Sequence, residues 1–203
     1  MGYDGGGVVG SFWDIEVSGQ TNSAGGAGKT MAEMQRAATF VSWGACGSEG
    51  VWTLNEDRDY PRLSWENRPG VALPALALSA FLEGSGTTDD PYLIFTAEEL
   101  NLIGLFPCDW DKHFRLMADI DLTPYTGTRF HIIGASGMPF TGVLDGNEHV
   151  VANFSYSRTR TNCIGLLGCV SGPNSMVKDL GLLDPNISSA ANSQVGSLVG
   201  YSE

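Results

Sequence analysis

One alternating segment constrains the fold of this chain more than any other. Between residues 114 and 122, apolar side chains alternate with mostly polar ones. Successive side chains of a β-strand point to opposite faces, so this alternation predicts a half-buried strand with a clear inside and outside. The inner set is Phe114, Leu116, Ala118, Ile120 and Leu122, and the outer set is Arg115, Met117, Asp119 and Asp121.

The residues before this strand predict a turn, a short strand and a capped helix. A Gly-Ser-Gly-Thr turn at 84–87 leads to an apolar strand at 92–95. Thr96 and Glu99 form a capping box, in which each side chain satisfies a free backbone N–H of the helix start. Further short strands, separated by Gly, Pro, Asn and Asp turns, are expected at 140–144, 150–154, 164–170 and 177–183.

The chain divides into three regions. Residues 1–66 form a first unit, 67–83 a Pro-, Ala- and Leu-rich linker, and 84–203 a second unit. The first unit is expected to hold a strand at 8–17 with Trp13, Ile15 and Val17 on its apolar face, and another at 51–54. Between them, a helix from 31 to 38 is capped by Thr30 and Glu33.

Composition agrees with a turn-rich β-protein and excludes some partners. The 203 residues include 27 glycines, and only 17% are charged. The formal net charge of −12 repels nucleic acid phosphates and anionic membranes, so no nucleic acid partner is expected. The longest apolar run, 71–82, contains Pro74 and is shorter than the ~20 residues that span a bilayer, so no membrane insertion is expected.

Glycines recur at a regular distance in the second unit. The segment 194–200 (Gln-Val-Gly-Ser-Leu-Val-Gly) repeats the pattern of 163–168 (Cys-Ile-Gly-Leu-Leu-Gly). Short strands with a regular repeat favour stacked coils of a solenoid, although a β-sandwich gives similar short strands.

These segments resemble the GLUG-motif proteins, a family of secreted and surface bacterial repeat proteins. Residues 140–149 (Phe-Thr-Gly-Val-Leu-Asp-Gly-Asn-Glu-His) resemble the family's turn, with Glu148 where glycine is usual. The resemblance implies a mainly β fold, a right-handed parallel β-helix with a short N-terminal capping helix. Residues 84–203 would be the cap and first coils, and 1–66 a small α+β closing unit of a preceding β-helix.

The resemblance implies a non-catalytic structural or adhesin-like module of a large secreted or cell-surface bacterial protein. The chain is then a fragment without its signal peptide, located outside the cell or on its surface. Its partners would be neighbouring β-helix coils of the full-length chain and a polysaccharide, surface glycan or protein. The alternatives are a fragment of a β-helix polysaccharide lyase or glycosidase, and an accessory region of a surface peptidase, because the motif also occurs in immunoglobulin A-cleaving peptidases.

Asp119 and Asp121 are the main candidate site residues. They share the outer face of one strand at about 7 Å, a separation that suits calcium ligands or the paired acids of glycoside hydrolysis. The alternative is two solvated or ion-paired acids, with Asp119 holding a turn. No catalytic residue and no cofactor other than Ca²⁺ is expected. Trp110, between Asp109 and Asp111, is expected to be exposed as a sugar-stacking surface.

The four cysteines, Cys46, Cys108, Cys163 and Cys169, include no C-x-x-C pair. On one strand, Cys163 and Cys169 would lie ~20 Å apart, whereas a disulfide needs Cα atoms within ~7 Å. These two are therefore not expected to pair directly unless a turn intervenes. Buried thiols are the favoured interpretation, and the disulfide state stays open.

Overall fold

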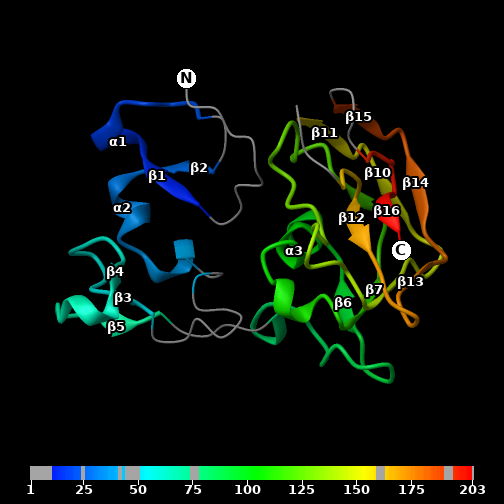
Figure 1. Ribbon diagram of the computed structural model, residues 1–203, viewed down its shortest axis with the longest axis horizontal. Helices are drawn as coiled ribbons and strands as arrows, with labels where there is room; N and C mark the ends of the chain where they lie inside the picture. Colours follow the sequence, from blue (N-terminus) through cyan, green and yellow to red (C-terminus); the bar gives the residue numbers. More distant parts are fainter. Residues whose placement is uncertain are drawn as a thin grey trace. The chain divides into compact units, whose positions relative to one another are not determined.

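The computed structural model describes residues 11–23, 26–40, 43, 51–73, 78–158, 163–189 and 194–202. The chain forms two compact units, Met1–Ala77 and Leu78–Glu203 (Figure 1). The division between the units falls inside the predicted linker at 67–83.

The first unit combines two small sheets with short helices. Strands β1 (Phe12–Asp14) and β2 (Ala27–Lys29) pair in parallel. Strand β3 (Trp52–Leu54) pairs antiparallel with β4 (Arg62–Leu63) and β5 (Val71–Ala72). The helices are α1 (Ile15–Ser18), α2 (Met31–Met34) and the 3₁₀ turns Ala37–Phe40 and Ser64–Glu66. A core of Met34, Phe40, Leu54 and Leu73 packs with Phe12, Trp43 and Trp52.

The described residues of the second unit form short strands in four parallel sheets. The strands are β6 (Tyr92–Ile94), β7 (His113–Leu116), β8 (Ile120–Asp121), β9 (Val143–Asp145), β10 (Val150–Ala152), β11 (Ser155–Arg158), β12 (Leu167–Val170), β13 (Met176–Lys178), β14 (Gly181–Leu183), β15 (Asn186–Ser189) and β16 (Val199–Ser202). Their orders within the sheets are β13-β9-β7-β6, β14-β10-β8, β11-β15 and β12-β16. The helices are α3 (Ala97–Ile103) and the 3₁₀ turns Leu78–Ala80 and Pro107–Asp109.

The prediction of a right-handed parallel β-helix is wrong. The described strands, each two to four residues long, form small separate sheets of two to four strands, parallel in most and antiparallel in the β4-β3-β5 sheet. Few helices accompany them. The left-handed residues Asn147, Asn153 and Asp179 come directly or shortly after the ends of β9, β10 and β13, so a turn ends each of these strands early. The β-helix prediction rests on the family resemblance together with the glycine repeat, and a set of small sheets with glycine turns also contains such a repeat.

The core of the second unit is built from side chains that lie in register on neighbouring strands. Tyr92 aligns with Phe114, and Phe114 aligns with Leu144. All three are buried, and the rings of Tyr92 and Phe114 lie 5.7 Å apart. Phe140 extends the row with its ring 6.0 Å from that of Phe114. The strands are therefore held together by stacked apolar side chains as well as by backbone hydrogen bonds.

Both predicted capping boxes are confirmed. The Thr30 hydroxyl accepts from the Glu33 backbone N–H at 3.2 Å, and a Glu33 carboxylate oxygen accepts from the Thr30 N–H at 2.8 Å. Thr96 and Glu99 make the same pair of bonds at the start of α3. The first of these helices, α2, ends at Met34 rather than at residue 38 as predicted.

Most of the predicted strands are shorter than expected, and the one at 177–183 is divided into β13 and β14. The described part of the predicted strand 8–17 has β1 only to Asp14, because the Asp14 carboxylate accepts from the N–H groups of Glu16 and Val17 and begins α1. As a result, Val17 is 70% exposed rather than on an apolar face. The strand predicted for 114–122 is divided into β7 and β8, although Phe114, Leu116, Ile120 and Leu122 are all buried as the alternation predicts.

The turn after β9 contains two adjacent left-handed residues. Asn147 has a φ of 50° and Glu148 a φ of 65°. Glutamate rarely adopts this conformation, for which glycine is better suited. The turn is held by the Glu148 N–H, which donates to the Asp179 carbonyl at 2.9 Å.

The interpretation of four buried thiols is also wrong. Cys163 and Cys169 form a disulfide with a Cα–Cα distance of 5.3 Å. The two residues do not lie on one extended strand, because β12 begins only at Leu167 and Cys163 has a left-handed φ of 60°. This turn is the exception under which pairing was allowed. Cys108 is disulfide-bonded as well, while Cys46 lies outside the described residues.

We predict that Phe114→Ala destabilises the second unit by ~3–5 kcal/mol, because the ring is fully buried between two neighbours in the core row. Urea unfolding measures the loss. His113→Ala, one position away and partly exposed, is the matched control and should cost much less. Equal losses in the two variants would contradict the assignment of Phe114 to the core row.

Candidate functional site

Asp119 joins two parts of the chain that are distant in sequence. It lies between β7 and β8, and one carboxylate oxygen accepts from the Val150 backbone N–H at 2.9 Å. The same oxygen lies 3.2 Å from His149 Nδ1. The bond from Val150, followed by that from His149, lowers the pKa of Asp119 below its usual range. Asp119 therefore fixes the beginning of β10 as an ionised acceptor.

Asp121 makes a similar set of contacts at the other end of β10. Its Oδ1 accepts from the Thr123 backbone N–H at 2.9 Å and from the Thr123 hydroxyl at 2.7 Å. It also accepts from Asn153 Nδ2 at 2.9 Å, just beyond β10. The side-chain bond from Asn153, then those from Thr123, lower the pKa of Asp121.

The two aspartates thus hold both ends of one strand, and their known partners are protein donors. Within the part of the chain that the structure describes, no three His, Cys, Asp or Glu side chains come together as a metal-binding cluster. Of the alternatives that the sequence left open, this geometry supports the one in which the acids hold turns. Calcium binding by Asp119 and Asp121 remains a prediction without further support.

A row of charged side chains crosses the outer face of the largest sheet. Arg115 on β7 aligns with Asp145 on β9, which aligns with Lys178 on β13. One oxygen of Asp145, Oδ2, accepts from Arg115 Nε at 3.2 Å and from Lys178 Nζ at 3.0 Å. Two cations, on β7 and on β13, therefore share one carboxylate on β9, the strand between them.

Asp145 is only 7% exposed, and this row explains why it stays ionised. Burial raises its pKa, but the hydrogen bonds from Lys178, Asn147 and Arg115 outweigh burial, so the pKa is lowered overall. The bond from the Asn147 N–H reaches the second carboxylate oxygen at 2.9 Å, and Asn147 Nδ2 donates to the Leu116 carbonyl. The row and the turn after β9 form one hydrogen-bonded unit.

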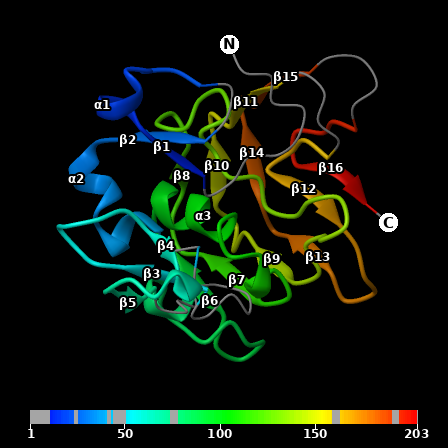
Figure 2. The same ribbon diagram turned by 60° about the vertical axis from the view of Figure 1, so that its left-hand side comes forward.

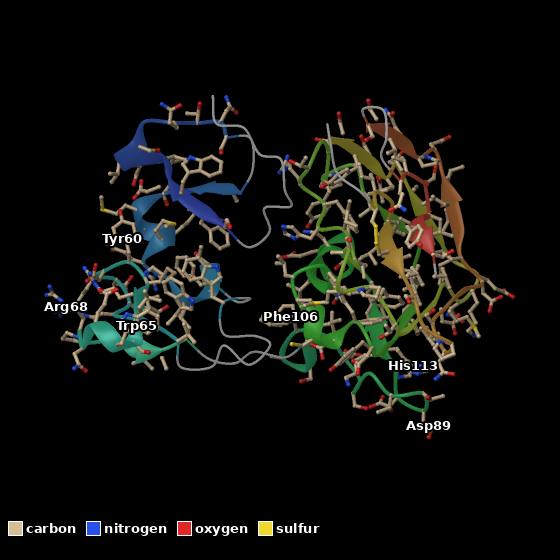
Figure 3. All side chains as sticks on the ribbon, viewed as in Figure 1. Tyr60, Trp65, Arg68, Asp89, Phe106 and His113 are labelled. Carbon is tan, nitrogen blue, oxygen red and sulfur yellow. A yellow bond between two sulfur atoms is a disulfide. The ribbon has the colours of Figure 1, made fainter. Side chains whose placement is uncertain are left out.

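Two shallow hollows adjoin on this same sheet face. One, of about 410 Å³, is lined by residues including Asp111, Thr141 and Asn174. The other, of about 250 Å³, is lined by residues including Arg115 and Met176. Both contain His113 and Val143, so they meet at these two residues. Figure 3 labels His113 on this unit, and its Nε2 lies 3.3 Å from the Thr88 hydroxyl.

The prediction that Trp110 is an exposed sugar-stacking residue is wrong. Its side chain is only 6% exposed, and its indole N–H donates to the Ile103 carbonyl at 2.9 Å. The Trp110 carbonyl in turn accepts from the N–H groups of Thr141 and Gly142. An indole can be buried when its one donor is satisfied, and here the end of α3 provides the acceptor. The flanking aspartates gave a misleading signal of exposure.

Sequence reasoning missed the Arg115–Asp145–Lys178 row. Asp145 was identified only as a turn residue, and Arg115 only as an outer residue of its strand. The signal lies in the pairing register, because charges of alternating sign occupy equivalent outer positions on three strands. A single sequence does not give that register until the strand boundaries are known.

We predict that Asp119 and Asp121 cause part of the loss of folding stability at acidic pH. Their pKa values are lowered in the folded chain, so their contribution is complete above the pKa of an unfolded aspartate, about 4, and is lost as the pH falls through the lower folded values. Asp119→Asn/Asp121→Asn should be slightly less stable at pH 7 and should lose less stability than wild type between pH 4 and 2. Thermal unfolding against pH measures this.

Asp89→Asn, an exposed carboxylate in a turn, is the control and should leave the profile unchanged. A double variant whose acid profile matches that of wild type would show that the two aspartates do not hold β10 as ionised acceptors.

Comparison with known proteins gives two relatives and no family. No family model matches the chain, and no solved structure matches it. The chain is 37% identical over 126 residues to a protein of Evansella cellulosilytica named as a Gly-rich membrane protein, covering 60% of this chain and 14% of that protein. It is 31% identical over 132 residues to halomucin of Haloquadratum walsbyi, covering 62% of this chain and 1% of halomucin.

The chain thus spans a small part of the length of both relatives. One relative is named as a membrane protein, and among the described residues no helix has the length and apolar character needed to cross a bilayer. Neither relative is named for a GLUG motif, so that resemblance stays a prediction. The relatives are compatible with a module of a large protein of the cell surface.

Proposed function

We propose that this chain is a non-catalytic structural module of a large cell-surface or secreted protein, and that its outer face contacts glycans or other proteins. The observation that carries the proposal is that the acidic side chains accept hydrogen bonds that hold the fold together. Asp119, Asp121 and Asp145, the acids best placed for chemistry, each accept several hydrogen bonds that join one part of the backbone to the next. They act as structural acceptors.

The cysteine chemistry supports a location outside the cytoplasm. Cys163 and Cys169 form a disulfide, and Cys108 is disulfide-bonded too. Disulfides persist in oxidising surroundings and are rare in the reducing cytosol. The names and lengths of the two relatives also support a module of a large surface protein, because the chain matches only 14% of one relative and 1% of the other.

The outer sheet face offers a surface for partners. The hollows that meet at His113 and Val143 combine imidazole, hydroxyl, amide and guanidinium groups with the apolar Pro91, Met176 and Pro173. Such a mixture suits the hydroxyl groups and C–H faces of a sugar chain as well as a protein surface.

We predict that the chain binds but does not cleave polysaccharides. Incubation with neutral and uronate-containing polysaccharides should release no new reducing ends and no unsaturated products, because the acids are occupied in structural bonds. Retention on the insoluble polysaccharides should fall at least about threefold in His113→Ala, which removes the residue that both hollows share. Met138→Ala, exposed elsewhere in the same unit, is the control. Turnover that is abolished by Asp119→Asn would establish an enzyme and overturn the proposal.

We predict that the module is accessible on intact cells. Brief protease treatment of the cells that make this protein should release peptides from the second unit into the medium before any cytosolic marker appears. Thiol alkylation of the native protein without reductant should leave Cys163 and Cys169 unmodified, since they are paired. Peptides that appear only after lysis, with alkylated cysteines, would place the module inside the cell and contradict the proposed location.

A further inference from the structure

Three strands of the largest sheet present one row of side chains on the outer face of that sheet. His113 on β7 aligns with Val143 on β9, and Val143 aligns with Met176 on β13. Figure 2 shows these three strands side by side. The next residues along β7 and β9, Phe114 and Leu144, are buried, so the row lies on the opposite face of the sheet. We call His113, Val143 and Met176 the outer row.

The outer row joins the two hollows of this face. His113 and Val143 line both hollows, and Met176 lines the smaller one. The hollows have volumes of about 410 and 250 Å³. Because they share two lining residues, a ligand that is longer than either hollow can lie across both. We call the two hollows together the sheet-face depression.

The spacing of the strands suits a chain of sugar rings. Neighbouring strands of a sheet lie about 4.8 Å apart. This distance is close to the repeat of pyranose rings along an extended polysaccharide. A polysaccharide that crosses β7, β9 and β13 therefore places one ring near each residue of the outer row. An added protein strand, by contrast, bonds to the edge of a sheet rather than to its face.

The side chains of the depression offer the two kinds of contact that a sugar ring needs. Val143 and Met176 provide apolar surface for the C–H face of a ring, and Met176 is 49% exposed. Thr141 and Asn174 provide an exposed hydroxyl and an exposed amide. Within the described residues, the Asn174 side chain makes no hydrogen bond, so its donor and acceptor are both available to a ligand.

The two cations of the smaller hollow are already paired with carboxylates. Arg115 and Lys178 share Asp145, with Nη2 of Arg115 at 3.1 Å and Nζ of Lys178 at 3.0 Å. Lys178 Nζ also lies 3.6 Å from Asp179. Two cations thus face two carboxylates, and a carboxylate or sulfate of a ligand finds no excess positive charge here. It would have to compete with Asp145 for the same donors.

The larger hollow has an acidic side chain. Asp111 lines it and is 59% exposed. Lys112 lies 3.2 Å from Asp111 but does not line the hollow. An exposed carboxylate accepts hydrogen bonds from sugar hydroxyl groups, whereas it repels an anionic ligand. The net charge of −12 on the whole chain adds to this repulsion.

We propose that the sheet-face depression binds a neutral polysaccharide, and that it discriminates against polysaccharides that carry carboxylate or sulfate groups. The rings lie along the outer row, and their hydroxyl groups bond to Asp111, Thr141 and Asn174. This inference rests on the proposed function, because it names the class of glycan that the outer face contacts.

Affinity electrophoresis of the 203-residue chain tests the inference. The probes are dextran, galactomannan and xyloglucan, each compared with the same polymer after oxidation of part of its sugar hydroxyl groups to carboxylates. At least one neutral polymer should retard the chain, and its oxidised form should bind at least about tenfold more weakly. Binding of the neutral polymer should not change between about 20 and about 200 mM salt, because no charge on the ligand takes part.

Met176→Ala shortens the outer row and should weaken binding of the neutral polymer at least about threefold. Met138→Ala is the matched control, since Met138 is similarly exposed, at 52%, and lines neither hollow. The wild-type chain gives an independent test if the variant fails to fold. Bound neutral polymer should slow the oxidation of Met176 by hydrogen peroxide and leave that of Met138 unchanged.

The outcomes separate this inference from the proposed function. Equal or tighter binding of the oxidised polymers would overturn the preference for neutral glycans and would keep glycan contact as a function. Equal slowing of the oxidation of both methionines would overturn the assignment of the depression as the site. Retention of neither form of any polymer would overturn the inference together with the proposed glycan contact. The structural role is tested apart from these, by polysaccharide turnover and by cell-surface accessibility.

Discussion

The second unit depends on the register in which its short strands are aligned. Strands of two to four residues provide too few hydrogen bonds to be stable alone. They become stable because Tyr92, Phe114 and Leu144 lie over one another, so the same alignment that pairs the backbones also buries the side chains. A shift of one residue would turn every inward side chain outward, so the register is strongly specified.

Polar side chains fix this register where the strands end. Asp119 and Asp121 hold the two ends of β10, and Asp145 joins β7, β9 and β13 through Arg115 and Lys178. Each carboxylate accepts several donors, which keeps it ionised at neutral pH and makes its loss expensive. The acidic composition, which first suggests calcium or catalysis, is used at these positions for holding the backbone.

Local signals in the sequence predicted local structure well. The alternation in 114–122 identified four buried residues, and the Thr30 and Thr96 capping boxes were found because their partners lie only three residues away. Strand ends were less predictable: the Asp14 carboxylate ends β1 because it accepts from the N–H groups of Glu16 and Val17 and so begins α1.

Contacts that depend on how the chain folds back on itself were the least predictable. The burial of Trp110 is possible because the Ile103 carbonyl accepts its indole N–H. Cys163 reaches Cys169 because a turn separates them. The Arg115–Asp145–Lys178 row forms only when three strands are aligned. The predicted fold class rested on the family resemblance and on the glycine repeat, and it was wrong for a related reason. A glycine repeat reports where the chain turns, whereas the arrangement of the sheets depends on where each strand stops.

The bonds around Asp145 also bear on chemical ageing. An Asp-Gly sequence such as Asp145-Gly146 is prone to isomerise when the glycine nitrogen attacks the aspartate side-chain carbonyl. Here the Gly146 N–H is bonded to the Lys178 carbonyl at 2.8 Å, and Arg115 and Lys178 hold the carboxyl in its ionised, less electrophilic form. A protein exposed for long periods without renewal would thereby keep this Asp-Gly bond intact.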